Sequence, residues 1–517
     1  MSKFIHILYF LFICIFTISI LGLTVRGIRG NPTTADLAKK TWTEDGPFEL
    51  SPERGRFALT YSIINDRSLS FSVDLARFVI PDLGYKDNKY VSLFAPGVSY
   101  IIAPGFVIGS WLGNSQVGAY SVISFFAFLN CVLIVLILHK YNVGLIASTL
   151  AAIVFIFATP AFSYAGTLYQ HHISTFLILA CIYLLSIGDS FLIFTGVWFL
   201  VATSIPVDYP NLILMIPIII WSITRTIYIK ATTLGKTLQL SIPKSLAIVG
   251  ITVPLIFFLW FNNASYGNPL QFSGTVPSVK DIGPDGRPTA PKEVNKYDLD
   301  KFVNPNKQKK SATGFFKTRN LINGLYTQLF SADRGVISFA PVLLILCLGI
   351  FSAVKKQTQL AQICISIIVA NIILYSLWGD PWGGWAFGAR YLVPTYALAA
   401  ILIGLALQAY RSSMIFLAIF ISLFVVSTYI NTAGALTSNA NPPKVEVLNL
   451  EKLSGHEEKY TYKRNIDKLK SGSSKSFAFQ TYYNRQLSAW NFFQIITCSI
   501  MLFGATLTGL LYTRKKE

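Results

Sequence analysis

Residues 119–138, AYSVISFFAFLNCVLIVLIL, form an uncharged and mostly apolar run of twenty residues. As an α-helix, a run of this length covers about 30 Å, which is the thickness of the hydrocarbon core of a bilayer. The rest of the 517-residue chain has a matching composition, with 53% hydrophobic residues, 13% charged residues and a mean hydropathy of +0.53. Soluble proteins carry about 25% charged residues. The composition therefore excludes a soluble globular enzyme.

Eleven further apolar blocks have the length and composition of membrane helices, so we predict an all-α polytopic protein with about twelve transmembrane helices. The twelve blocks are residues 4–23, 119–138, 143–160, 171–187, 190–204, 209–224, 245–262, 335–354, 358–378, 391–409, 412–431 and 489–512. The six cysteines all lie inside such blocks and form no CxxC pair. We interpret them as small packing residues rather than disulfide partners.

The distribution of basic residues predicts the orientation of these helices. With the N-terminus in the cytoplasm, the short inner segments hold twelve Lys and Arg, whereas the short outer turns hold only Arg390. Cytoplasmic loops are the ones enriched in Lys and Arg. Both termini are thus predicted to be cytoplasmic, in the plasma membrane if the cell is prokaryotic. The same rule explains the net charge of +19 without a nucleic acid partner.

Three long hydrophilic segments then lie outside, at residues 24–118, 263–334 and 434–488. We predict a transmembrane region over 1–433 that includes the first two segments, an outer loop or small cap over 434–488, and a last helix with a basic tail over 489–517. Val91–Gly113 is apolar but is broken by Pro96-Gly97 and Pro104-Gly105. A crossing there would invert the downstream topology, so we predict a membrane-surface helix in the first outer loop.

Motifs of soluble enzymes are absent, including the P-loop, the dinucleotide-binding glycine pattern, HExxH and GxSxG. Asp298-Leu299-Asp300 resembles the metal-binding DxD of nucleotide-sugar transferases. It lies in a Lys-rich loop rather than after a strand, so ordinary loop charge explains it better. We predict no metal site and no cofactor, although the sequence leaves a divalent metal open.

Polar residues at the predicted outer face are better candidates for a functional site. Tyr164–His172 (YAGTLYQHH) places His171 and His172 where a helix enters the bilayer, and Asp208-Tyr209-Pro210-Asn211 begins another helix. Trp378–Tyr391 (WGDPWGGWAFGARY) combines tryptophans, glycines and one arginine. Each stretch also has a plain structural explanation: helix capping or packing for the histidines, a favourable charge at a helix N-terminus for Asp208, and an aromatic belt for the tryptophans.

The first outer segment holds nine acids, most of which must be solvated charge. Two of them stand in suggestive contexts. Glu53 precedes Arg54 and Arg56 on a predicted amphipathic helix in Ser51–Asp66 (SPERGRFALTYSIIND), and Asp82 precedes the apolar surface segment in Pro81–Gly97 (PDLGYKDNKYVSLFAPG). A carboxylate that is partly removed from water at this depth can act as a general base.

These stretches, taken in order, resemble the lipid-carrier-dependent membrane glycosyltransferases of the C-type fold. Relatives in that family include the dolichyl-phosphate-mannose protein mannosyltransferases and the bacterial transferases that add aminoarabinose to lipid A. The matching stretches are Arg56-Phe57 with Leu69, Asp82 with Asp87–Ser92 and Pro96-Gly97, Tyr169–His172, Asp208–Pro210, Asn262–Gly274, Ser331–Pro341 and Trp382–Leu392. The chain departs from the pattern at Asn88, where Gly is usual, and at Glu53, which stands alone where the family often has Asp-Glu.

The resemblance implies an inverting transfer of a sugar from a polyprenyl-phosphate donor to an extracytoplasmic protein, lipid or glycan. It implies that Asp82 or Glu53 is the base, with Asp82 modestly favoured by its motif. The residues implied to stabilise the donor phosphate are Arg390, His171, His172, Arg56 and Arg334. Further residues implied to line the site are Asp87, Asp208, Tyr209, Trp382 and Trp385. Two alternatives stay open, namely a non-catalytic envelope-assembly scaffold of the same fold and a lipid-linked sugar transporter or flippase.

Overall fold

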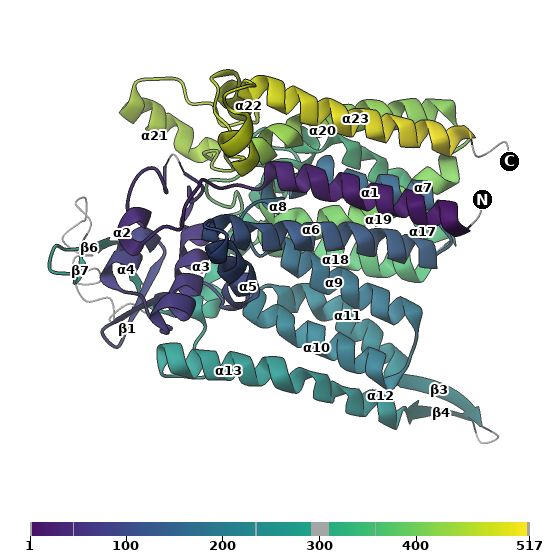
Figure 1. The fold of residues 1–517 in the computed structure, drawn as a ribbon. Coiled ribbons are helices and arrows are strands. Elements are labelled where there is room, and N and C mark those ends of the chain that lie inside the picture. The colour runs from purple at the N-terminus through teal and green to yellow at the C-terminus, as the bar shows by residue number, and fades with distance from the viewer. Residues whose placement is uncertain (1–2, 45, 233–234, 291–309, 357, 514–517) are drawn as a thin grey trace.

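The computed structural model describes residues 3–44, 46–232, 235–290, 310–356 and 358–513. Most of these residues form helices that run side by side in one bundle (Figure 1). The bundle helices are α1 (Lys3–Thr24), α6 (Ser115–Lys140), α7 (Leu145–Phe157), α9 (His171–Ile187), α10 (Phe191–Val207), α11 (Asn211–Thr226), α12 (Ile242–Leu246), η2 (Ala247–Ile251), α13 (Thr252–Tyr266), η8 (Pro341–Ile345), α17 (Leu346–Lys356), α18 (Thr358–Ser376), α19 (Val393–Tyr410), α20 (Met414–Leu436) and α23 (Ala489–Thr513).

Each of the twelve predicted apolar blocks contains one of these helices or a consecutive run of them. Among the described residues, six stretches are long and apolar enough to cross a membrane, which identifies an integral membrane protein. These are Ser115–Lys140, Ile242–Tyr266, Gln359–Ser376, Arg390–Tyr410, Met414–Leu436 and Ala489–Thr513. The other blocks form shorter apolar helices, so the exact number of twelve crossings stays a prediction.

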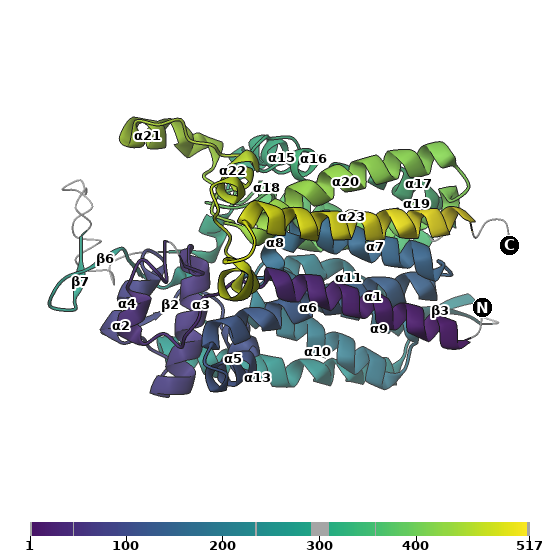
Figure 2. The same ribbon diagram turned by 45° about the horizontal axis from the view of Figure 1, so that its top comes forward.

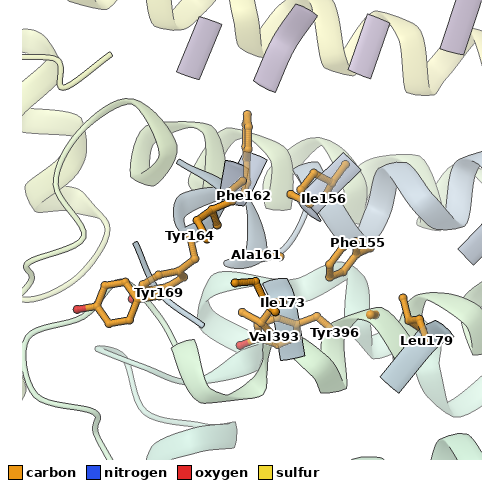
Figure 3. Close-up of a cluster of buried hydrophobic side chains, with 14 of the residues drawn as sticks. Phe155, Ile156, Ala161, Phe162, Tyr164, Tyr169, Ile173, Leu179, Val393 and Tyr396 are labelled. Carbon is orange, nitrogen blue, oxygen red and sulfur yellow. The ribbon is translucent and has the colours of Figure 1, made fainter. Parts of the chain in front are cut away.

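Helix α19 forms the centre of the bundle. Every residue from Val393 to Leu407 is buried, as expected for a helix that is apolar all round. Small residues such as Ala400 and Gly404 allow α7, α9, α17 and α18 to pack closely around it. Figure 3 shows part of this core, with Val393 and Tyr396 of α19 close to Ile173 of α9 and side chains of α7 and α8 (Ala161–Ala165) nearby.

The three hydrophilic segments gather at one end of the bundle. The start of α1 and the end of α23 lie at the opposite end of the bundle, together with the hairpin of β3 (Ile227–Thr232) and β4 (Gly235–Leu240) (Figure 1). The segments therefore share one side, in agreement with the predicted topology. Which side faces the cytoplasm stays a prediction.

The first segment contains two short strands as well as helices, in a structure that is mostly helical as predicted. Its elements are α2 (Thr34–Leu37), α3 (Ser51–Tyr61), η1 (Ser62–Asp66), α4 (Val73–Val79), β1 (Leu83–Lys86), β2 (Lys89–Ser92) and α5 (Gly97–Trp111). The strands β1 and β2 form a hairpin whose turn places Asp87 and Asn88 at positive φ, 48° and 60°. Asn tolerates this left-handed conformation better than most residues do. This explains how Asn88 can occupy a position where Gly is usual.

The predicted surface helix is α5, which begins at Gly97 rather than at Val91 because Val91 and Ser92 belong to β2. It contains Pro104 and packs against the first half of α6 (Figure 2). Glycines make this contact close, since a Cβ on Gly105 would lie 2.4 Å from the carbonyl oxygen of Gly118. Small residues in such positions let two helix backbones approach each other.

The second segment is tied to the first by a shared sheet and by side-chain bonds. Strand β1 pairs with β5 (Ser278–Val279), and β6 (Asp281–Ile282) forms a hairpin with β7 (Pro288–Thr289). The Arg77 guanidinium donates to the carbonyl of Gly283 at 3.0 Å, and the Tyr90 hydroxyl donates to that of Gly286 at 2.8 Å. The two segments thus form one extramembrane unit.

The third segment forms a small helical cap of α21 (Lys444–Ser454), α22 (Lys463–Lys470) and η10 (Phe479–Tyr483). Backbone bonds join it to the chain that leaves α1: the amide of Gly27 donates to Lys475 at 3.3 Å, and that of Phe477 donates to Val25 at 2.8 Å. Because α1 and the cap lie at opposite ends of the sequence, these bonds close the extramembrane end of the bundle.

The arrangement predicts the result of a topology experiment. Reporter fusions at Thr60, Asp285 and Tyr460 should report the same compartment, and fusions at Lys140 and Gly235 should report the other one. The physical reason is that the first three positions lie at the end where the segments gather and the last two lie at the opposite end. Equal reporter signals at Gly235 and Asp285 would contradict a crossing by α12–α13.

Candidate functional site

Several charged and aromatic side chains meet where the extramembrane unit contacts the bundle. They come from α3, from the turn before α9, from the turn between α10 and α11, and from the loop that follows α18. Most are buried, although each belongs to a residue type that is usually solvated. Such a cluster requires internal partners, and its contacts are described below.

Arg56 connects three of these elements. It lies on α3, which begins with Ser51-Pro52, and its guanidinium donates to the carbonyl of Leu168 at 3.0 Å and to the side-chain oxygen of Gln170 at 2.6 Å. The amide of Gln170 donates in turn to the Asp208 carboxylate at 2.9 Å. This chain of bonds fixes the positions of α3, α9 and the α10–α11 turn relative to one another.

Tyr169 lies between two arginines. Arg390 donates to its hydroxyl at 2.8 Å and lies 4.9 Å from its ring centre, while Arg56 lies 5.4 Å from the same ring. His171 stacks on Tyr169 with ring centres 5.5 Å apart, and its ring also meets the edge of Tyr391. Cation–π attraction to a shared electron-rich ring lets two like charges stay close together.

This arrangement leaves hydrogen-bonding groups without partners. Among the described residues, the Nε atoms of Arg56 and Arg390 and the Nε2 atom of His171 are buried and accept or donate no hydrogen bond. Buried polar atoms without a partner are uncommon in native proteins and often mark a place where a ligand or water binds. Two cations with free N–H groups suit an anionic ligand such as a phosphate.

Glu53 is one of the acids of this cluster and the one fully removed from solvent. It is 0% exposed, and neither carboxylate oxygen has a well-formed hydrogen bond to the described residues. Burial raises its pKa to about 7, against an opposing effect of Arg26, while nearby Glu49 raises it further and the Leu168 backbone amide and Arg56 lower it. A carboxyl with this pKa is partly ionised at neutral pH and can exchange a proton there.

Glu49 belongs to a buried ion network that sequence reasoning missed. Its carboxylate lies 3.7 Å from the Arg26 guanidinium and 3.5 Å from the Lys475 ammonium. Arg26 also donates to the side chain of Asn439 at 2.8 Å. The network therefore joins the chain that leaves α1, the first segment and the third segment close to Glu53. No local pattern signals it, because Asn439 and Lys475 lie hundreds of residues from Arg26 and Glu49.

The two predicted bases differ in their surroundings. Asp82 is partly exposed and accepts a 2.6 Å hydrogen bond from the Ser51 hydroxyl at the start of α3. Arg54 is half-buried, and the charges of both Asp82 and Glu53 act on its guanidinium. Asp87, at the tip of the β1–β2 hairpin, is 70% exposed. Glu53 and Arg56 influence each other through their charges.

Asp208 is linked to Arg56 through Gln170, and Tyr209 follows it in the α10–α11 turn. Burial raises the pKa of Asp208, and the hydrogen bond from Gln170 and the charge of Arg56 oppose this rise. The hydroxyls of Tyr209 and Ser273 are 2.9 Å apart, which connects the α10–α11 turn to the second segment. Tyr209 also contacts the ring of Phe272.

Arg334 does not have the free donors that a phosphate ligand needs. Its guanidinium donates to the carbonyls of Trp382 and Gly384, each at 2.8 Å, and to that of Asn441 at 2.9 Å. A further bond goes to the carbonyl of Asp333. These contacts hold the loop between α18 and α19 against the cap, so we interpret Arg334 as a positioning residue rather than a phosphate ligand.

Three glycines of this loop are explained by its backbone conformation. Gly383, Gly384 and Gly388 have φ values of 73°, 60° and 62°, which side chains other than glycine rarely adopt. The loop can therefore curve so that Arg390 points at Tyr169 while Trp382 presents its carbonyl to Arg334.

Two other predicted site residues have structural contacts. The Nε2 atom of His172 lies 2.8 Å from the carbonyl oxygen of Ala161, and its other ring nitrogen faces Asn130 at 3.5 Å. Trp385 donates from its indole to Glu446 of the cap at 2.8 Å. Neither residue contacts the pair of arginines through a described hydrogen bond, which favours packing roles for both.

Sequence reasoning missed Tyr169, Gln170 and Asp380 as members of the cluster. Tyr169 and Gln170 stand directly before His171 in the quoted YQHH stretch, so their position was a usable signal. Asp380, in the loop after α18, interacts with Arg390 and with the amides of Gly383 and Gly384. Burial raises its pKa, and these contacts oppose that rise.

No group of three or more His, Cys, Asp or Glu side chains among the described residues is placed to hold a metal ion. The Asp298-Leu299-Asp300 motif lies in 291–309, outside the residues that the structure describes.

No protein-family model matches this sequence, and no curated protein is detectably similar to it. Among solved structures, ArnT from Cupriavidus metallidurans in the apo state is similar, with a TM-score of 0.47, 10% identity, and coverage of 98% of this chain and 77% of that one. The same protein bound to undecaprenyl phosphate has a TM-score of 0.43 and 13% identity, with coverage of 99% of this chain and 78% of that one.

Archaeal oligosaccharyltransferase AglB from Archaeoglobus fulgidus, in complex with an inhibitory peptide and a dolichol-phosphate, gives a TM-score of 0.45 and 13% identity. The similarity covers 98% of this chain and 56% of AglB. These proteins are of the kind that the sequence motifs resemble. Identities of 10–13% and TM-scores below 0.5 are too low to assign a family, so the function is argued below from the chain's own residues.

The contacts of Arg334 predict a test that separates positioning from ligand binding. Arg334→Gln should lower the melting temperature in detergent, because losing several buried charged hydrogen bonds costs about 3 kcal/mol or more. Arg319→Gln is the matched control, since Arg319 is an exposed arginine of the second outer segment. Equal melting temperatures for the two variants would contradict the positioning role.

Proposed function

We propose that this membrane protein is a glycosyltransferase that moves a sugar from a polyprenyl-phosphate carrier to an extracytoplasmic acceptor hydroxyl. One observation carries the proposal: two arginines with free N–H groups share Tyr169, close to a buried carboxyl without a firm partner. This combination offers an anion site and a proton acceptor next to each other at the membrane end of the extramembrane unit. A transporter or an inert scaffold has no need for a proton acceptor beside an anion site.

The donor phosphate is proposed to bind at Arg390 and Arg56, with His171 as a further donor. Guanidinium groups bind phosphate through paired charge-assisted hydrogen bonds. During transfer, negative charge collects on the phosphate as it leaves, and fixed cations in a site with little water stabilise that charge strongly. The polyprenyl tail would remain among the membrane helices, which end at this site.

The reaction is a single displacement. The acceptor oxygen forms a bond to the anomeric carbon while the bond between that carbon and the phosphate oxygen breaks, and the bonding electron pair leaves with the phosphate. The acceptor proton passes to a carboxylate. Because attack and departure occur on opposite faces, the anomeric configuration is inverted.

Glu53 is the carboxylate that the geometry favours for this role. Its charge acts on Arg56 and Tyr169, and Tyr169 contacts Arg56 and Arg390, so we assign these four residues to one cluster. Asp82, which the motif favoured, is partly exposed and already accepts a hydrogen bond from Ser51. We therefore propose Glu53 as the base and Asp82 as a residue that positions the start of α3, with Asp82 as base kept as the alternative.

The choice of base predicts the effect of two substitutions. Glu53→Gln should reduce transfer by about 10²–10⁴-fold, the usual contribution of a general base. The ionised form is the active one and the pKa of Glu53 is raised to about 7, so the wild-type rate should increase as pH rises through that value. The measurement is the release of polyprenyl phosphate from lipid-linked sugar in membranes, as a function of pH.

Asp82→Asn is the matched control for the Glu53 variant. It should retain most turnover and the same increase of rate with rising pH, because the proposed base is still present. Loss of turnover in Asp82→Asn with a normal rate in Glu53→Gln would reverse the two roles. Normal rates in both variants would favour the scaffold or transporter alternatives over an enzyme.

The phosphate contact predicts a second pair of variants. Arg390→Ala should reduce turnover by about 10²–10³-fold, as does removal of one donor to a developing negative charge. Arg390→Lys should recover only part of that loss, since an ammonium cannot make the paired contacts of a guanidinium. The readout is mass spectrometry of the lipid-linked sugars that accumulate in cells carrying each variant. Normal levels of these sugars in Arg390→Ala would contradict a phosphate contact and would leave the Trp378–Tyr391 stretch with the role of an aromatic belt.

A further inference from the structure

A polar cavity lies in the extramembrane unit and shares no residue with the arginine cluster. Its volume is about 890 Å³, within the range of about 300–1,000 Å³ that is usual for ligand pockets. The first segment supplies residues before α4 and around the β1–β2 turn, and the β6–β7 hairpin supplies the opposite wall. The lining residues are Ser70, Phe71, Ser72, Val73, Tyr85, Asn88, Lys89, Tyr90, Asp285, Gly286, Arg287, Pro288 and Thr289.

Hydrogen bonds hold the walls of this cavity in place. The Tyr90 hydroxyl donates to the carbonyl of Gly286 across the base of the cavity, and the Arg77 guanidinium donates to that of Gly283 behind it. The amide of Phe71 donates to the carbonyl of Tyr90 at 2.8 Å. Both walls are therefore attached to the same sheet, and the cavity does not depend on a ligand to form.

The lining combines aromatic rings with hydroxyl, amide and charged groups. Tyr85 and Tyr90 have ring centres 5.2 Å apart, and the Tyr85 hydroxyl donates to the side-chain oxygen of Asn88 at 3.3 Å. Lys89, Asp285 and Arg287 add charges of both signs. Sugar rings present apolar C–H faces that pack on aromatic rings, and their hydroxyls both donate and accept hydrogen bonds. The mixture suits a carbohydrate better than it suits a lipid tail.

We propose that this cavity binds a short run of sugar units of the acceptor, which deepens the proposed function and rests on it. A peptide is less well suited, because peptides commonly add to a free strand edge and the edge of β2 at Tyr90 is already paired with Phe71. Recognition here must come from side chains, and the side chains present are those that bind hydroxylated rings.

A short rigid path connects the cavity to the proposed base. Tyr85 lies on β1, and β1 begins one residue after Asp82. The carboxylate of Asp82 accepts the bond from Ser51, two residues before Glu53 on α3. An acceptor chain held against β1 is thus held by the same local structure that positions the α3 carboxyl.

The test measures binding without turnover. Purified full-length protein in detergent is applied to an array of short oligosaccharides that contain neutral hexoses, N-acetylhexosamines and uronic acids. Wild type should bind at least one of these classes, and Tyr85→Ala should weaken that binding by about fivefold, the effect of one lost aromatic contact. Asn88→Gly should also weaken it, because glycine keeps the left-handed backbone at φ 60° while removing the amide.

Tyr482→Ala is the matched control, since Tyr482 is 62% exposed and lies on η10 in the third segment. It should bind as wild type does. Binding of no oligosaccharide, unchanged binding in both cavity variants, or Tyr85-dependent binding of Ser/Thr-rich peptides on a parallel array would overturn the inference. Glu53→Gln should bind normally, so a failure of the proposed chemistry and a failure of this inference give different results.

Discussion

The contact of Arg56 and Arg390 with one tyrosine ring is the interaction on which the functional end of the molecule depends. Arg56 belongs to the first extramembrane segment and Arg390 to the loop before α19, and Tyr169 stands at the entrance to α9 between them. Two like charges in such a position would separate unless a ring and fixed carbonyls offset their repulsion and their loss of water. The bond of Arg56 to Leu168 and the bond of Arg390 to Tyr169 supply this compensation. The Nε–H groups of Arg56 and Arg390 are left without hydrogen-bond partners among the described residues, and it is here that we propose an anion binds.

The bilayer imposes a complementary constraint on the rest of the chain. Inside the hydrocarbon region a polar group must find its partner within the protein, and α19, buried from Val393 to Leu407, avoids the difficulty by being almost entirely apolar. The ionic networks are found instead at the end of the bundle. Arg334 with its carbonyl partners and Glu49 with Lys475 each join pieces of chain that are far apart in sequence. The extramembrane segments therefore act as the frame of the site as well as its cover.

Burial has opposite consequences for the acids and bases of this site. It raises the pKa of Glu53 to about 7, which prepares the carboxyl to exchange a proton near neutral pH. Burial lowers the pKa of Arg56 to about 10, which still leaves the guanidinium charged at neutral pH. One environment can thus hold a permanent cation for a phosphate and a titrating carboxyl for an acceptor hydroxyl.

The sequence by itself determined the membrane character, the positions of the apolar helices and the grouping of three hydrophilic segments at one end, because bilayer thickness acts on composition within about twenty residues. It also indicated Arg390, His171 and Asp208, since these stand at the ends of apolar blocks, and it indicated Arg56 through the family resemblance. Only the tertiary structure showed that Glu53 is fully buried whereas Asp82 is partly exposed, that Arg334 donates to four backbone carbonyls, and that His172 faces Ala161. The same holds for the ion network of Arg26, Glu49 and Lys475. The physical reason is that hydrogen bonds and burial depend on contacts between distant segments, which no local pattern of residues specifies.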